Sequence, residues 1–465
     1  MSTPRKSARL AAAKSATLDD PIIAATSSSS IKKVAVYSHS IAPSIDGVCR
    51  RYSGILQELV RRGVEVLLFT IETEPEDVPP GVEIVCLEYM IMPAYPGKKV
   101  ARPTWAVLAK VLSTLSAFHP DVVHMTNDGF SQIFEAAALF LGLPLVGAFH
   151  TDILELVQRH NGHLFQQGCV LAKELTDSLL LDSCATTSIS FLNKLAGKGI
   201  HCQHVIITGV DMTVFHPSKF DAQLRVDMTF GDKQGFLCVY IGRISREKRI
   251  DIIIDAVQQI PHCYLAIIGD GPSAPIYAKL HGKENRIFCR PQFLDHEELA
   301  NVYASSDLHV SASEFETLGN TVLEANSCGI PVVVPRTQGF CDTVQHESNG
   351  FLFKAGDSED ARMYIDRLKS DKKLLQKMGN DALQAVTSNT MVRVVDDIMQ
   401  WYQSGQKASQ QRAWWKKLLA FLLLAGTLPF GILSLCCYRL LVSACPPTHP
   451  LPFYLRSRLE RPRPG

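Results

Sequence analysis

The sequence predicts an α/β protein of two doubly wound domains, each built on a parallel sheet, followed by one transmembrane helix near the C-terminus. Two series of short β-branched runs alternate with helix-length segments, which is typical of parallel sheets with helices on both faces. The 465 residues are too many for one core, and 46% hydrophobic with 20% charged residues is a globular composition. A long uncharged apolar run follows the second series.

Charge and cysteine content exclude two broad classes. The 47 Lys and Arg residues nearly balance the 46 Asp and Glu residues, so no global field draws the protein onto nucleic acid. The 13 cysteines are scattered without a C-x-x-C pair, unlike a disulfide framework or a zinc site. We expect most of them to be reduced packing residues.

Residues 1–31 are expected to form a disordered or targeting tail. Met1 to Lys33 is rich in Ser and Ala and has six Lys and Arg residues against Asp19 and Asp20, with no long apolar run. It is therefore no secretory signal. A disordered tail and an organellar transit peptide both remain open, although the two aspartates weaken the second.

The first domain is expected at residues 32–212. Its first strand, "KKVAVYSHS", is followed by the helix "RRYSGILQELVRRG" and the strand "VEVLLFTI", and later strands are "VEIVCL", "DVVHMT" and "PLVGAFH". Gly47 lies between the first strand and its helix. There a glycine lets the backbone approach a ligand, and the helix N-terminus favours an anion.

The second domain is expected at residues 235–385, after a linker at 213–234, and a cross-over helix at 386–403 follows it. Its strands are "GFLCVYIG", "CYLAIIGDGP", "RIFCR", "DLHVSAS" and "PVVVP". Ligands of such sheets bind at the carboxyl ends of the strands, so two facing domains form a cleft.

Two cations follow the first strand of the second domain. "IGRISREKRID" places Arg243 beside a glycine and Lys248 five residues later. If the loop folds back, both can face one anion, and a diphosphate suits two such donors.

Two glutamates mark a later strand end, in "SEFETLGNTVLEANSCG". They are eight residues apart, so on one helix they would sit about 80° apart and share no face. We expect Glu316 on the loop, pointing into the cleft, and Glu324 on the second turn of a helix that ends at Gly329. The amides of Leu318 and Gly319 suit a phosphate or sugar oxygen. The two carboxylates could therefore hold a sugar and a ribose.

The run from Leu418 to Tyr438 has no charge and is about 32 Å long as a helix, enough to span a bilayer core. Its flanks carry aromatic and basic interfacial anchors, Trp414, Trp415, Lys416, Lys417, Tyr438 and Arg439. Pro429 and Gly431 leave a kinked span or a shallow hairpin open, and a buried helix is a further alternative. We expect the main body to face the cytosol or an equivalent compartment, and residues 443–465 to be a disordered tail.

Taken together, "GRISREK", "ETLGNTVLEANSCGIPVV", "TGVDMTVFHP" and "FHTD" resemble the retaining glycosyltransferases of group 1, family-four type. That resemblance covers about Lys32 to Gln403 and implies the GT-B fold, two Rossmann-like domains facing across a cleft, with a nucleotide-sugar donor. It implies that Arg243 and Lys248 hold the donor diphosphate, that Glu324 binds the ribose, and that Glu316 with the Leu318 and Gly319 amides binds the transferred sugar.

The resemblance also implies that His150, after "PLVGAF", lies near the sugar. No metal or other cofactor is implied, and His160 and His163 are expected to be loop residues. No residue is an evident covalent nucleophile, so the implied route is front-face departure and attack. Arg243 and Lys248 would then stabilise the charge that develops on the diphosphate.

Segments such as "MPAYPGKKVARP" and "HPDVVHMTNDG" are most similar to sulfolipid (sulfoquinovosyldiacylglycerol) synthases, and related to bacterial lipid mannosyltransferases. The resemblance implies transfer of sulfoquinovose from its UDP donor to a membrane lipid such as diacylglycerol, in glycolipid biosynthesis; a chloroplast membrane is one candidate location. Mannose, glucose and galactose stay open as donor sugars. No cation is assigned to a sulfonate, and the basic residues considered, each expected to be solvated, are Arg50, Arg51, Lys98, Lys99 and Arg102.

Two other function classes stay open. A nucleotide-sugar epimerase shares the two-domain architecture, but its product would form without an acceptor. An inactive membrane scaffold would keep the fold and lose the cleft residues, whereas Arg243, Lys248, Glu316 and Glu324 are all present.

Overall fold

The computed structural model describes residues 31–43, 47–91, 99–127, 131–159, 164–419 and 422. Three predicted features lie almost wholly outside these residues: the N-terminal tail, the transmembrane run 418–438 and the C-terminal tail. Lys98, His160 and His163 also lie outside them.

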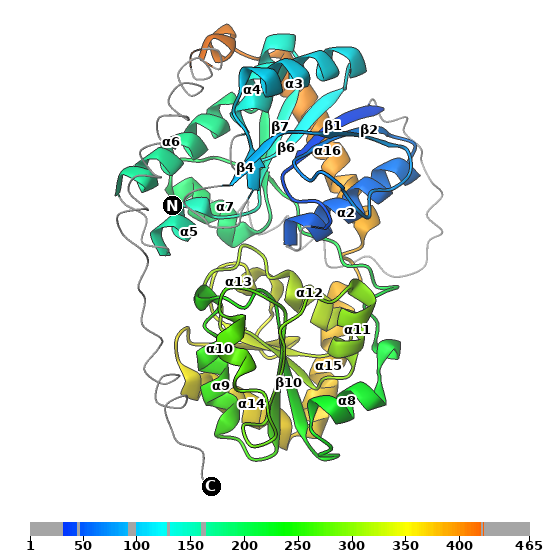
Figure 1. Cartoon of the computed structure of the whole chain (residues 1–465), viewed down its shortest axis with the longest axis vertical. Coiled ribbons are helices and arrows are strands. Elements are labelled where there is room, and N and C mark those ends of the chain that lie inside the picture. The colour runs from blue at the N-terminus through cyan, green and yellow to red at the C-terminus, as the bar shows by residue number, and fades with distance from the viewer. Residues whose placement is uncertain are drawn as a thin grey trace, which may run out of the picture. The chain divides into compact units, whose positions relative to one another are not determined.

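The first domain is built on a seven-stranded parallel sheet in the order β3-β2-β1-β6-β7-β8-β9 (Figure 1). Strands β4 and β5 form a separate antiparallel pair and come between β3 and β6 in the chain. The strands of this domain are β1 (Lys33–Ser38), β2 (Glu65–Thr70), β3 (Val82–Cys86), β4 (Tyr89–Ile91), β5 (Lys99–Ala101), β6 (Val122–Thr126), β7 (Leu145–Phe149), β8 (Ser183–Thr186) and β9 (His204–Val205).

Helices cover both faces of this sheet because its strands are apolar on both sides. Val34 and Val36 of β1 pack in the core beneath α2 and α16, while Ala35 and Tyr37 pack on the opposite face with α3, α4 and α7. The helices that precede the second domain are α2 (Gly47–Arg61), α3 (Trp105–Phe118), α4 (Gln132–Leu141), α5 (Ile153–Arg159), α6 (Leu164–Leu180) and α7 (Ile189–Gly197).

The second domain repeats the plan with a six-stranded parallel sheet in the order β12-β11-β10-β13-β14-β15. In both sheets the winding direction reverses beside the first strand, between β1 and β6 and between β10 and β13, so each domain has its switch point there. The strands of the second sheet are β10 (Phe236–Ile241), β11 (Cys263–Ile268), β12 (Ile287–Arg290), β13 (Leu308–Val310), β14 (Val332–Pro335) and β15 (Gly350–Phe353).

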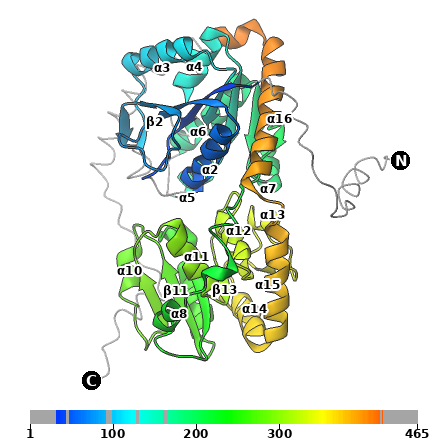
Figure 2. The same ribbon diagram turned by 90° about the vertical axis from the view of Figure 1, so that its right-hand side faces the viewer.

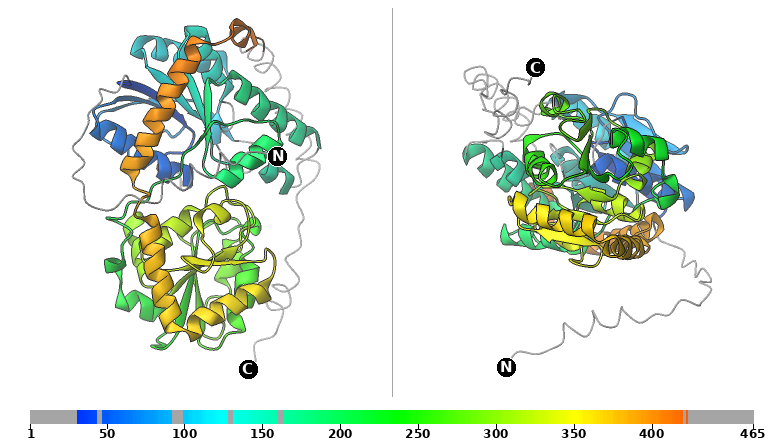
Figure 3. Two further views of the ribbon diagram at one scale, coloured as in Figure 1. Left: turned by 180° about the vertical axis from the view of Figure 1, so that it is seen from behind. Right: turned by 90° about the horizontal axis from the view of Figure 1, so that it is seen from below.

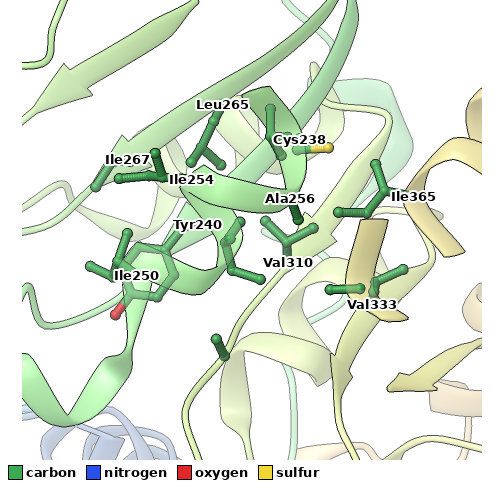
Figure 4. Close-up of a cluster of buried hydrophobic side chains, with 14 of the residues drawn as sticks. Cys238, Tyr240, Ile250, Ile254, Ala256, Leu265, Ile267, Val310, Val333 and Ile365 are labelled. Atoms are coloured by element: carbon green, nitrogen blue, oxygen red, sulfur yellow. The ribbon is translucent and has the colours of Figure 1, made fainter. Parts of the chain in front are cut away.

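Two cores sandwich the second sheet. Figure 4 shows one of them, where Ile254 of α9 lies near Leu265 and Ile267 of β11 and Ile250 lies beside Tyr240 of β10. The opposite core is formed with α8, α11 and α12. The helical segments of this half of the chain are η2 (Pro217–Lys219), α8 (Ala222–Met228), η3 (Arg246–Lys248), α9 (Ile250–Gln258), α10 (Ala274–Ala278), α11 (His296–Ala304), α12 (Asn320–Ser327), α13 (Phe340–Thr343), α14 (Ser358–Ser370), α15 (Lys372–Val386) and α16 (Met391–Gln410).

The segment 213–234, expected as the linker between the domains, has structure of its own. This segment carries η2 and α8, and Phe215 and Met228 are buried in the core of the second domain. The Asp221 carboxylate caps α8 by accepting from the Gln223 and Leu224 amides. Apolar anchors and an N-cap therefore give this segment a folded structure.

Helix α16 crosses back onto the first domain and lies beside α2 (Figures 2 and 3). It begins at Met391 behind an N-cap, Thr390, rather than at 386, because α15 continues to Val386. Trp401 and Tyr402 are fully buried, and the Trp401 indole N–H donates to Ser183 Oγ at 3.1 Å. Helix α16 is thus part of the core of the first domain.

Within the described ranges, no helix has the length and apolarity needed to cross a bilayer. The chain that leads toward the apolar run is tied to the first domain. Arg412 pairs with the buried carboxylate of Asp182, and the Lys416 ammonium donates to the Leu181 carbonyl at 3.0 Å.

Candidate functional site

A cavity of about 740 Å³ lies between the carboxyl ends of the two sheets, and residues of both domains line it. Most of the predicted site residues are on its wall, which agrees with the rule that such sheets bind ligands at their switch points. Those residues are Gly47, His150, Arg243, Lys248, Glu316, Leu318 and Gly319. Glu324 does not line the cavity.

The loop after β10 brings the two predicted cations to the cavity. The Tyr240 hydroxyl donates to the Arg243 carbonyl at 2.8 Å, and Lys248 ends the short turn η3. The adjoining loop after β11 approaches closely, since a Cβ on Gly269 would lie 2.1 Å from the Gly242 carbonyl oxygen. Only glycine fits at this close approach of the two loops.

Glu316 lies on the loop before α12, where its carboxylate forms an ion pair with Lys248. Gly319 follows in the left-handed region, with φ +87°, and a Cβ there would lie 2.8 Å from the Phe340 ring. The loop therefore turns sharply and presents the first-turn amides of α12 toward the cleft. Cation, carboxylate and amide donors meet in one place.

The first domain holds the same loop through Thr317. The Thr317 carbonyl accepts from the hydroxyls of Ser188 at 2.6 Å and Thr187 at 3.3 Å, and the Thr317 hydroxyl donates to the His150 carbonyl at 2.7 Å. These hydroxyl residues were missed, because nothing in the sequence indicated that the domains touch at this point.

Glu324 lies on α12, the helix on which it was expected, and it is buried without lining the cavity. Its Oε1 accepts from Arg50 of the first domain at 2.7 Å and its Oε2 from the Tyr303 hydroxyl at 3.0 Å. Burial lowers the pKa of Arg50, but the Glu324 charge, the nearby Tyr303 and the hydrogen bond to Glu324 together outweigh it, so the pKa is raised overall. The cause is the face of α12 on which Glu324 lies, which packs against α11.

Gly47 meets the second domain. Its carbonyl accepts from the Asn320 amide at 3.4 Å, and a Cβ would lie 2.7 Å from Asn320 Nδ2. We expected the backbone at Gly47 to approach a ligand closely; in this structure it approaches Asn320 at the start of α12.

His150 lines the cavity and begins a buried chain of hydrogen bonds. Its Nε2 lies 3.0 Å from the Tyr52 hydroxyl, which lies 2.7 Å from His124 Nε2; His124 Nδ1 lies 2.7 Å from the Tyr402 hydroxyl. Burial, with a smaller contribution from Arg51, lowers the pKa of His124 to about 3, so this ring is neutral. In the sequence, the signal of this buried chain is a histidine inside the apolar run "DVVHMT".

The described basic residues considered for a sulfonate all have protein partners. Arg51 is buried and donates to Thr208 Oγ1 at 2.9 Å and to the Ile206 carbonyl at 2.7 Å, and burial lowers its pKa to about 10. Lys99 pairs with Glu72 at 2.9 Å and Arg102 with Glu88 at 3.6 Å. The expectation of solvated charge was therefore wrong for Arg50 and Arg51, whose positions at the start of α2 place them against the rest of the protein.

Across the residues that the structure covers, no group of three His, Cys, Asp or Glu side chains is placed to hold a metal ion. The cavity wall instead combines fixed cations, a carboxylate, a histidine and backbone amides. Such a set can bind a polyanion joined to a hydroxyl-rich group.

Two family models match the chain, one on each domain. "Glycosyltransferase Family 4" matches residues 45–214 and "Glycosyl transferases group 1" matches residues 229–385. Among curated proteins, the sulfoquinovosyl transferase SQD2 of Arabidopsis thaliana is 28% identical over 78% of this chain and 72% of its own length. A GDP-mannose-dependent alpha-mannosyltransferase of Corynebacterium glutamicum is 26% identical, over 80% and 88%. The alpha-monoglucosyldiacylglycerol synthase of Acholeplasma laidlawii is 22% identical, over 75% and 91%.

Solved structures share the fold. The sucrose-phosphate synthase of Thermosynechococcus elongatus superposes with a TM-score of 0.65 and 20% identity, over 80% of this chain and 98% of that one. HepE of Anabaena, solved in complex with UDP and glucose, gives 0.64 and 20%, over 80% and 100%.

Proposed function

Because this chain is a group-1 glycosyltransferase of the family-four type with a GT-B fold, we propose that it is a retaining enzyme that moves a sugar from a UDP-sugar to a membrane lipid. Sulfoquinovose is the first expectation for the sugar and diacylglycerol for the acceptor. The alternative is a mannosyl or other hexosyl transferase that uses a UDP- or GDP-sugar.

The observation that carries the proposal is the meeting of Arg243, Lys248 and the first-turn amides of α12 at the switch point of the second domain. Two cations and a helix N-terminus favour a diphosphate. Lys248 is paired with Glu316, so a bound diphosphate would compete with that carboxylate for the ammonium. Glu316 would then be released toward the hydroxyls of the transferred sugar.

In the proposed reaction, the bond between the anomeric carbon and the diphosphate oxygen breaks while a bond from that carbon to the acceptor oxygen forms on the same face. The acceptor proton passes to the leaving phosphate oxygen. Arg243 and Lys248 stabilise the negative charge that develops on the diphosphate. His150 lies across the cleft on the first domain, where it would contact the sugar. Glu324, held by Arg50 and Tyr303, would orient the ribose from behind the cavity wall.

A lipid acceptor is supported by two kinds of observation. Relatives of this chain include a sulfoquinovosyl transferase and a glucosyldiacylglycerol synthase. Independently, the sequence after Leu418 is apolar and uncharged to Tyr438. We propose that this run anchors the enzyme in a membrane with the two domains on the cytosolic or equivalent side.

The test is incubation of the membrane-bound protein with a panel of UDP- and GDP-sugars and diacylglycerol vesicles, with glycolipid read by mass. An anionic sulfoquinovosyl lipid from the UDP donor supports the first expectation, and a neutral hexosyl lipid supports the alternative. A changed sugar nucleotide without any acceptor product would instead indicate an epimerase. Nucleotide-sugar binding without chemistry would indicate an inactive scaffold.

Two variants refine this test. Arg243→Ala should lower turnover severely, and full activity in it would remove the diphosphate role. Deletion of residues 418–465 should release the protein from membranes while activity on detergent-dispersed lipid is kept.

A further inference from the structure

We propose that Tyr402, His124 and Tyr52 form a directed chain of hydrogen bonds that fixes the tautomer and the ring orientation of His150 at the cleft wall. They would be positioning residues that act through His150. The assignment of His150 to the sugar rests on the proposed function, whereas the direction of the chain follows from the geometry alone.

The chain is continuous and spans the first domain from its interior to the cleft. The three contacts between successive polar atoms are 2.7 Å, 2.7 Å and 3.0 Å, starting from Tyr402. All four side chains are buried, with exposed fractions of 0% for Tyr402 and Tyr52, 2% for His124 and 7% for His150. Only His150 borders the cavity.

Each link in such a chain needs one proton, and Tyr52 has one proton for two imidazole neighbours. The Tyr52 hydroxyl can donate to one ring and must accept an N–H from the other. His124 is bonded through both of its nitrogens, and as a neutral ring it carries one proton. The protons therefore all point toward the cleft or all point away from it.

The hydrogen bonding of the Tyr402 hydroxyl, at the end of the chain farthest from the cleft, decides between these two directions. In the part of the chain that the structure describes, the contact with His124 Nδ1 is the one hydrogen bond of the Tyr402 hydroxyl. If the protons pointed inward, the hydroxyl proton of Tyr402 would have no acceptor in a fully buried site, which is costly. Tyr402 therefore donates to His124 Nδ1, His124 Nε2–H donates to Tyr52, and Tyr52 donates to His150 Nε2.

With Nε2 accepting from Tyr52, His150 then carries its proton on Nδ1. Neighbouring rings hold the chain still. His124 packs edge-on against Trp401 with ring centroids 4.9 Å apart, and Tyr52 packs edge-on against His150 at 5.5 Å. Because Tyr402 lies on α16, the cross-over helix sets the hydrogen-bonding state of a cleft residue in addition to joining the two domains.

The direct test reads tautomers in the substrate-free protein by long-range proton–nitrogen NMR with ¹⁵N-labelled histidine. The two signals are assigned by their loss in His124→Gln and His150→Gln. We expect an Nε2–H tautomer for His124 and an Nδ1–H tautomer for His150. The opposite pair, or a mixture at either ring, would overturn the proposal. This readout needs no donor or acceptor, so it stands even if the proposed reaction is wrong.

The kinetic test uses Tyr402→Phe, which removes one oxygen and keeps the ring in the core. Loss of one hydrogen bond should lower kcat about five- to tenfold, with the donor KM changed less than about twofold, and should leave His150 in a mixture of tautomers. The matched control is Tyr264→Phe, which removes the hydroxyl of a buried tyrosine that donates to Asp232 at 3.0 Å in the second domain. Unchanged kcat with an unchanged His150 tautomer in Tyr402→Phe would overturn the proposal. If that variant fails to fold, the tautomers of the wild-type protein decide.

Discussion

Replacement of Arg50 by methionine tests whether the ion pair between the two domains supports nucleotide binding. Arg50→Met keeps most of the side-chain length and removes the guanidinium that donates to Glu324 at 2.7 Å. The Arg50 side chain is 25% exposed and that of Glu324 is 7% exposed. Methionine would therefore leave a nearly buried carboxylate with Tyr303 as its remaining partner.

The size of the effect follows from that partial exposure. A hydrogen bond to a charged group contributes about 1.5–3 kcal/mol, and we take the lower end because water reaches Arg50. About 1.5 kcal/mol corresponds to roughly a tenfold weaker Kd for UDP, if Glu324 orients the ribose. Because the pair joins two domains that each have their own cores, the melting temperature should fall by only a few degrees.

The assay is calorimetric titration with UDP, and with GDP as the second nucleotide. Arg62→Met is the matched control, since Arg62 is 22% exposed and pairs with Asp396 and Glu58 away from the cavity. A double-mutant cycle with Glu324→Gln measures the coupling between the two partners. Coupling near zero with an unchanged Kd would refute the reasoning. Tighter UDP binding would refute it differently, because it would mean that Arg50 competes with the ribose for the carboxylate.

Three further predictions concern stability. Burial raises the pKa of Glu174 to about 7, so between pH 4.5 and 7 the folded state binds more protons than the unfolded state and the free energy of unfolding falls as pH rises. Glu174→Gln should remove that penalty, raising the free energy of unfolding at pH 8 by about 3 kcal/mol and changing it little at pH 4.5, as urea titrations at both values would measure; equal gains at both would contradict this. Gly379→Ala should destabilise by about 2 kcal/mol, because its Cβ would lie 2.4 Å from the Gly329 carbonyl oxygen. Gly168 lies in the exposed part of α6, where an added Cβ would have no atom within 4 Å, so Gly168→Ala should raise the free energy of unfolding by about 0.5–1 kcal/mol. Urea denaturation measures both alanine variants, and a change of the same sign in the two would contradict the reasoning.

The order of the elements could be predicted because it depends on local patterns. Parallel strands buried on both faces appear as short apolar runs such as "FLCVYI", and helices between them carry their own caps and glycine stops. Seven predicted site residues reach the cavity for the same reason, since they follow strand ends and the carboxyl ends of a doubly wound sheet share one edge. Arg243, Lys248 and Glu316 needed no knowledge of the other domain to be placed there.

The sequence by itself therefore determined the two doubly wound domains and the residues that the strand ends contribute to the cleft wall. Tertiary structure alone decided which groups meet across the chain. Arg50 lies 274 residues from Glu324 and Tyr402 lies 278 residues from His124, yet each pair is within hydrogen-bond distance. The sequence around a charged or hydroxyl side chain does not show which distant residue it will contact. Apolar periodicity, in contrast, shows directly which face of an element is buried. That is why the burial of Glu324 against Arg50 and the hydrogen-bond chain behind His150 could not be predicted from the sequence.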